Sequence, residues 1–230
     1  MCFLLISLAL TVAQPAPEST MFEGLLDRLP QAAPREFATP DAVVREYFEA
    51  IINNQVERTF KCVPLRAQYV AASFEAEVTR LGAYSPTSTS PPEDHYSRFM
   101  EVLQGHHATV KFLRYLLLAK ADREAAEALN SVTSAELVDG KVDPQWVKRM
   151  AEVLSLQKLS KYEIKTLTSE PCPSKPSGFG GVTISEAAFV HVVIAKGDIE
   201  IQQELLVGKV GENFQILRFP SLPSGFRGSP

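Results

Sequence analysis

The hydrophobic pattern of the chain changes its period near residue 160, and this change constrains the fold more than any other feature. Before it, apolar residues recur every three or four positions, as in helices. After it, they alternate with polar residues, most clearly in the segment IEIQQELLV (199–207). That alternation predicts a half-buried antiparallel strand. Helices followed by such strands indicate an α+β fold, in which N-terminal helices pack on a C-terminal antiparallel sheet, rather than a doubly wound α/β fold.

Four segments are predicted to form this sheet as a meander. They are residues 161–170, 182–195, 199–207 and 214–219. The polar and glycine-containing stretches KGD and GKVGEN separate the last three and suit tight turns. The closing segment FQILRF is densely apolar, and we expect Phe214 to be an anchor of the core.

The helical half begins with the segment TPDAVVREYFEAIINNQ. Thr39 suits the N-cap, Pro40 the first helical position, and Asp41 the positive end of the helix dipole. Further helices are predicted at 55–63, 65–82, 143–159 and through most of 94–130, the last with a break at Gly105. A Ser/Thr/Pro-rich loop is expected at 83–94.

Two stretches resemble one known superfamily. The opening TPDAVVREYFEAIINNQVERTF and the closing AFVHVVIAKGDIEIQQELLVGKVGENFQILRF are similar to nuclear-transport-factor-2-like (cystatin-like cone) domains, secreted bacterial members among them. Gly211, Phe214 and Ile216 fill the closing pattern Gly-x-x-(Trp/Phe)-x-Ile of that family. The resemblance covers about residues 39–63 and 161–219.

This resemblance implies a single domain over residues 39–219, in which a curved sheet wraps around the opening helix. Residues 65–159 would then be a helical insertion, and 220–230 a C-terminal tail. The concave face of the sheet often forms a cone-shaped pocket in the family, so the resemblance also implies a pocket in this chain.

The N-terminus carries an apolar run at residues 2–12, with the small residues Thr11 and Ala13 before Gln14. This pattern is typical of a signal peptide at 1–13, although no basic residue precedes the run; the alternative is a buried N-terminal helix. A signal peptide predicts a secreted or periplasmic protein. Residues 14–38 are expected to be a flexible lead-in, with a short amphipathic helix at 21–29. No later apolar segment has the length of a membrane span.

After removal of a signal peptide, Cys62 and Cys172 are the remaining cysteines. In an oxidising compartment they are able to pair, and a Cys62–Cys172 disulfide would join the helical half to the sheet half. The alternative is two separate thiols, with Cys62 in the core.

Charge and motifs exclude several classes of function. Lys and Arg number 23 against 27 Asp and Glu, and they form no basic cluster, so nucleic-acid binding is not expected. The sequence contains no phosphate-binding loop and no nucleophile elbow or zinc-protease motif, so we predict no cofactor. His106 and His107 are adjacent and would diverge on a helix, and no metal site is predicted.

Three residues are weak candidates for catalysis. His191 shares a strand face with Phe189 and Val193, which we interpret as the inward face, and its side chain suits a general base. Tyr47 and Tyr162 carry hydroxyl groups that could assist. For His191 the alternative is a core or edge histidine with a backbone partner, and for the two tyrosines it is a buried aromatic ring with its hydroxyl at the surface.

Two functional hypotheses follow. The first is a secreted or envelope-associated binding or accessory module, non-enzymatic, which holds an apolar small molecule or a protein partner and is able to form a homodimer through its sheet face. The second is a small cone-fold enzyme, an isomerase, dehydratase or hydrolase of an apolar small molecule. A pocket with two converging titratable groups would favour the enzyme.

Overall fold

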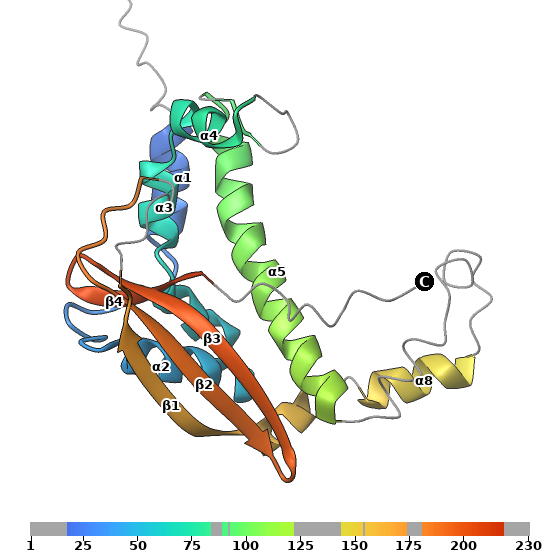
Figure 1. The fold of residues 1–230 in the computed structure, drawn as a ribbon. Coiled ribbons are helices and arrows are strands. Elements are labelled where there is room, and N and C mark those ends of the chain that lie inside the picture. The colour runs from blue at the N-terminus through green and yellow to red at the C-terminus, as the bar shows by residue number, and fades with distance from the viewer. Residues whose placement is uncertain are drawn as a thin grey trace, which may run out of the picture.

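The fold is mixed helix and sheet, with the helices preceding the sheet in the chain, as the sequence predicts (Figure 1). The structure is a computed structural model. It describes residues 18–83, 89–91, 93–121, 144–153, 155–173 and 181–218. The predicted signal peptide and the tail 220–230 lie outside these residues.

The helical elements are α1 (Glu18–Leu26), α2 (Pro40–Ile52), α3 (Leu65–Ala71), α4 (Phe74–Leu81), α5 (His95–Ala121) and α8 (Pro144–Val153), with the 3-10 helices η1 (Val56–Cys62) and η2 (Leu156–Lys161). The Thr39 hydroxyl accepts a hydrogen bond from the amide of Ala42 at 3.3 Å, which confirms the predicted cap of α2. Residues 65–82 form two helices and not one. The predicted break at Gly105 is wrong, because α5 runs through it.

The sheet is a four-stranded antiparallel meander in the order β1-β2-β3-β4. Its strands are β1 (Glu163–Pro171), β2 (Ala187–Lys196), β3 (Ile199–Val210) and β4 (Asn213–Arg218). Gly197 and Gly211 have φ angles of 57° and 62° in the two turns that join the last three strands. Glycine adopts such angles without the strain that a Cβ would add, so both turns suit tight hairpins.

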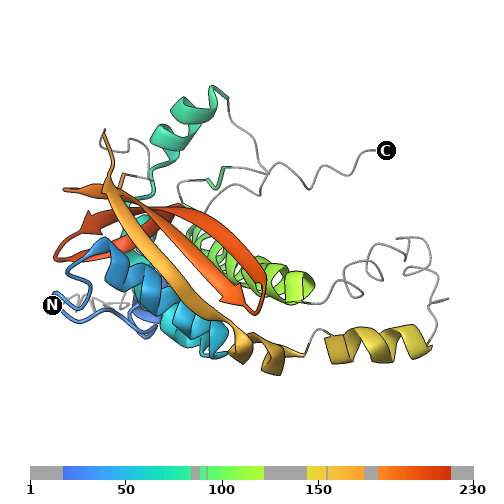
Figure 2. The same ribbon diagram turned by 60° about the horizontal axis from the view of Figure 1, so that its bottom comes forward.

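Helix α2 lies along one face of the sheet, and the sheet curves around it (Figures 1 and 2). Tyr47, Phe48 and Ile51 of α2 are almost fully buried. They belong to one core with the inward residues of the strands, among them Val190, Val192, Ile194, Leu205, Val207, Phe214 and Ile216. Burial of this apolar area is the main force that holds α2 to the sheet.

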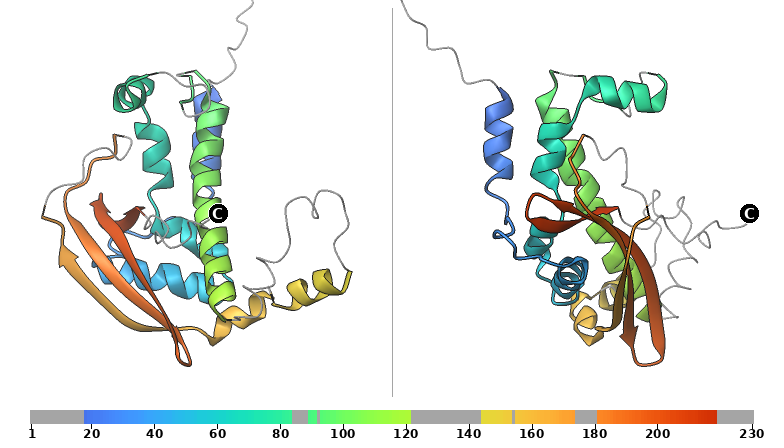
Figure 3. Two further views of the ribbon diagram at one scale, coloured as in Figure 1. Left: turned by 45° about the vertical axis from the view of Figure 1, so that its right-hand side comes forward. Right: turned by 60° about the vertical axis from the view of Figure 1, so that its left-hand side comes forward.

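Helix α5 is part of the same body, not an appendage to it. Its residues Val110, Leu113 and Leu117 are buried in the core that α2 and the strands form. The Tyr162 hydroxyl donates a hydrogen bond to the Leu117 carbonyl at 2.5 Å, which ties the start of β1 to α5. At the other end of the molecule α1, α3 and α5 lie side by side (Figure 3).

The segment before α2 is packed, which differs from the predicted flexible lead-in. Phe22, Leu26 and Phe37 are buried in the core. Asn213 in β4 binds this segment twice: its side-chain oxygen accepts from the Phe37 amide, and its side-chain nitrogen donates to the Ala33 carbonyl, both at 2.9 Å. The Phe214 amide also donates to the Phe37 carbonyl at 2.9 Å. The packed body therefore begins before residue 39, because the lead-in covers β4.

Within the described residues, no helix is both long enough and apolar enough to cross a bilayer.

Candidate functional site

A pocket of about 310 Å³ lies between α5 and β4, and we call it the α5–β4 pocket. Five of its residues are on α5, at the three- and four-residue spacing of one helix face: Glu101, Val102, Gly105, His106 and Thr109. The facing walls come from the segment around the start of α3 and from β4, with Val63, Leu65, Gln68, Ile216 and Leu217. Apolar walls with a few polar groups are typical of small-molecule sites.

Gly105 leaves open space at this face of α5. A Cβ built on it would meet no atom within 4 Å outside its own surroundings. Glycine within a helix costs about 0.5–1 kcal/mol of stability relative to alanine. Gly105 therefore lowers the stability of α5, and its missing side chain leaves room in the pocket wall.

His106 is the most deeply buried polar group of the pocket, with only 6% of its surface exposed. Its ring packs near those of Phe60 and Tyr47, with centroid separations of 5.0 and 6.2 Å. Burial, and to a smaller extent the charge of neighbouring His107, lower the pKa of His106 to about 4. The imidazole is therefore neutral at pH 7.

The hydrogen bonds around Thr59 determine which His106 nitrogen carries the proton. The Thr59 hydroxyl donates its one proton to the Val56 carbonyl at 2.6 Å. Its oxygen, 2.9 Å from Nε2 of His106, must then accept from that nitrogen. Nδ1 is thus the unprotonated acceptor, and it has no hydrogen-bond partner among the described residues.

The predicted inward position of His191 is wrong. Its side chain is 45% exposed on the outer face of β2, while Val190 and Val192 face the core. There it lies 3.5 Å from Glu170 on β1 and 3.5 Å from Glu204 on β3. Both alternating sets of residues in β2 are largely apolar, so alternation alone could not identify the inward face.

The two candidate tyrosines are buried in the core, and their hydroxyl groups are buried as well, whereas the alternative to a catalytic role expected the hydroxyls at the surface. Burial raises the pKa of Tyr47 well above its usual value and that of Tyr162 to about 12, so both stay protonated. The Tyr162 hydroxyl is committed to the Leu117 carbonyl. His191 on the outer face does not meet either of them, so the structure does not bring the three candidates together.

The structure contains Cys62 and Cys172 as separate thiols, so the predicted disulfide between them is not formed in it. Cys62 is fully buried in η1, where its thiol lies 3.6 Å from the Arg58 carbonyl. Burial raises its pKa, so it stays a thiol and is a poor nucleophile. Cys172 directly follows β1, where its amide donates to the Ala187 carbonyl at 2.9 Å.

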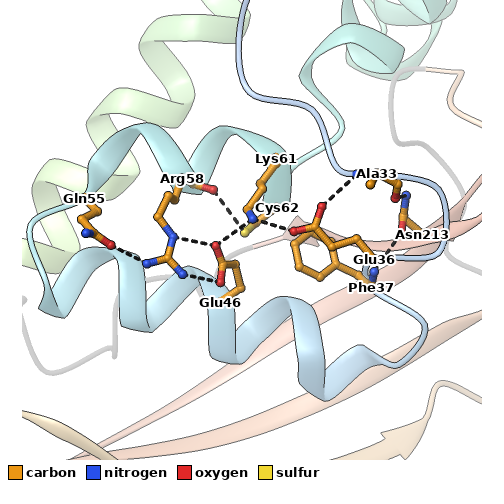
Figure 4. A network of polar contacts seen from close by, with 9 residues as sticks. All are labelled: Ala33, Glu36, Phe37, Glu46, Gln55, Arg58, Lys61, Cys62 and Asn213. Carbon is orange, nitrogen blue, oxygen red and sulfur yellow. Dashed lines mark hydrogen bonds and ion pairs between the residues drawn. The ribbon is translucent and has the colours of Figure 1, made fainter.

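A polar network close to Cys62 joins the lead-in, α2 and η1 (Figure 4). Arg58 binds both carboxylate oxygens of Glu46, at 2.8 and 2.6 Å. Lys61 bridges Glu36 at 2.6 Å and Glu46 at 3.0 Å.

These contacts affect the charges of the network. The hydrogen bond from Arg58, with help from Lys61, lowers the pKa of Glu46. Each charge in the network faces an opposite one, so we interpret it as a clamp on the lead-in and not as a binding site.

Among the described residues, no group of three or more His, Cys, Asp and Glu side chains could hold a metal ion. No protein-family model, no curated protein and no solved structure matches the chain.

The pocket was not found from the sequence, although one signal for it was present. Gly105 appeared there only as a helix break, and His106 only as half of a poor metal pair. A glycine inside a strongly helical segment, next to a histidine and three residues from an apolar position, is a pattern that could have indicated a pocket wall.

Proposed function

We propose that this protein is a secreted or envelope-associated binding module, non-enzymatic, which takes a small and mainly apolar ligand into the α5–β4 pocket. The observation that carries the proposal is the pocket itself. Its volume of about 310 Å³ is at the lower end of the range for small-molecule sites, roughly 300–1,000 Å³. Val63, Leu65, Val102, Ile216 and Leu217 give it apolar walls.

A place in the nuclear-transport-factor-2-like superfamily remains part of this proposal. The opening helix packed against a curved antiparallel meander supports it. The secreted location rests on the apolar run at residues 2–12. Mass spectrometry of the protein from an exporting bacterial host should find Gln14 at the N-terminus; retention of residues 1–13 would contradict export.

The alternative of a cone-fold enzyme has less support. It needs two titratable groups that converge on a cavity. His191 lies exposed on the outer face of the sheet, away from the two buried tyrosines. His106 is a weak base with a pKa of about 4.

Binding of phenylbutanol, a neutral apolar probe, tests the pocket. We expect chemical-shift changes in a two-dimensional amide NMR spectrum that cluster on α5 and β4. Gly105→Leu should abolish them, because the new side chain fills open space in the wall. It should not impair folding, because leucine is a better helix former than glycine.

Gly24→Leu is the matched control. Gly24 is also a helical glycine without atoms within 4 Å of a built Cβ, but it lies in α1, outside the pocket lining. This variant should bind the probe as the wild type does. Unchanged binding in Gly105→Leu, or no binding by the wild type at millimolar probe, would overturn the proposal.

A further inference from the structure

The polar groups of the α5–β4 pocket are mainly hydrogen-bond acceptors. Nδ1 of His106 is an unprotonated acceptor, because Nε2 carries the proton that Thr59 accepts. A buried acceptor without a partner costs about 1–3 kcal/mol. Nδ1 has no partner among the described residues and exposes less than 1 Å² of surface. A ligand that brings a donor to it, with a small shift of the side chains around it, would recover part of that free energy.

Two further residues of the wall are acceptors as well. The Thr109 hydroxyl donates to the Gly105 carbonyl at 2.9 Å, so its oxygen retains lone pairs and no proton to offer. Glu101 is a carboxylate, with one oxygen bound by the Ser90 hydroxyl at 2.6 Å. The side-chain amide of Gln68 can donate or accept hydrogen bonds, so it favours neither a donor nor an acceptor on the ligand.

The charge of the wall has one sign. Among the described residues that line the pocket, Glu101 is acidic, and Lys and Arg are absent. His106 is neutral at pH 7 and adds no positive charge. A cation at this site would therefore be attracted, whereas an anion would be repelled and would find few donors.

We propose that the α5–β4 pocket binds a small amine, whose ammonium group donates to Glu101 and to the acceptors of the α5 face, and whose apolar body lies against Leu65, Val102 and Ile216. This inference rests on the proposed function and names its ligand class. A body on the order of ten non-hydrogen atoms suits the volume, at about 30 Å³ for each water-sized group.

Three probes with the same body test the ligand class: phenylbutylamine, phenylbutanol and phenylbutyrate, titrated at pH 7 and followed by calorimetry and amide NMR. We expect the amine to bind about tenfold more tightly than the carboxylate, with the alcohol between them; this ratio corresponds to about 1.4 kcal/mol. Equal or tighter binding of phenylbutyrate would overturn the amine assignment and leave the proposed function standing. No binding by any of the three would overturn both.

Glu101→Gln tests the source of the preference. Glu101 is exposed on α5, so the variant should fold normally, and it should reduce the advantage of the amine over the alcohol. The control is Glu75→Gln, an exposed glutamate in α4 that does not line the pocket and should leave the preference unchanged. A preference that Glu101→Gln does not alter would overturn the role of this carboxylate.

Side-chain nitrogen NMR tests the contact with His106. At pH 7 its Nδ1 should resonate as an unprotonated nitrogen, and phenylbutylamine should shift this signal while phenylbutyrate should not. A protonated Nδ1, or a signal that the amine does not move, would overturn the His106 part of the proposal. Gly105→Leu, which blocks the pocket, should remove the shift.

Discussion

Strand β4 borders two regions that are filled to different degrees. Phe214 and Ile216 pack with α2 in a core whose largest members, such as Tyr47 and Phe48, are almost fully buried. Near the end of the strand, Ile216 and Leu217 also line the α5–β4 pocket, where Gly105 leaves space. Large apolar side chains at helical spacing on α2 fill the core. On α5, a glycine at the same kind of spacing leaves the pocket open.

The largest effect is expected on the filled side. Phe214→Ala should lower the free energy of unfolding by about 3–5 kcal/mol, because it leaves a cavity between β4 and α2. Urea denaturation measures this change. Phe189→Ala, at a half-buried position on the outer face of β2, is the control and should cost less than half as much. Equal losses of unfolding free energy in the two variants would contradict the difference in burial between the inner and outer faces of the sheet.

Acid should lower the stability of the folded protein through His106. In the unfolded chain this histidine takes up a proton near pH 6.5, whereas in the folded protein its pKa is about 4. The unfolded state therefore binds more protons between these values, and stability falls as the pH drops from 6.5 to 4, by about 3 kcal/mol from this group.

Urea denaturation of the wild type and His106→Phe across this range checks the acid effect. The variant should lose less stability than the wild type between pH 6.5 and 5, whereas His191→Gln, at an exposed position on the outer face of β2, should follow the wild type. The lowered pKa values of Glu36 and Glu46 act mainly below 4.5, so they do not obscure the upper part of the window. If the unfolding free energies of the wild type and His106→Phe changed with pH in parallel, this would contradict a neutral, buried imidazole at His106.

A smaller effect of opposite sign is expected at the open side. Gly105→Ala should raise the free energy of unfolding by about 0.5–1 kcal/mol, because alanine favours the helix and its Cβ meets no atom within 4 Å. Thermal and urea denaturation measure the gain. A loss of stability would show that the space above Gly105 is filled.

The smallest effect is expected at His191. Its two contacts at 3.5 Å with Glu170 and Glu204 are exposed to solvent, and such surface pairs contribute little. His191→Gln should change the free energy of unfolding at pH 7 by less than about 0.5 kcal/mol. A loss above about 2 kcal/mol would place this side chain in the core after all.

The sequence by itself determined the α+β class, the order of the elements and most of their positions. Thr39 caps α2, and the four predicted strands correspond to β1–β4 to within a few residues at most ends. These features depend on local periodicity, capping and turn chemistry, which neighbouring residues fix. The same local signals placed Phe214 in the core correctly.

Tertiary structure decided which face of β2 is inward, how the lead-in packs and where a pocket remains. His191 was placed inward because alternation defines two faces but does not choose between them when both are apolar. The lead-in is held by Asn213, a residue far along the chain, which no local pattern could reveal. The pocket exists only where α5 meets β4, since a void depends on the fit between segments that are distant in sequence.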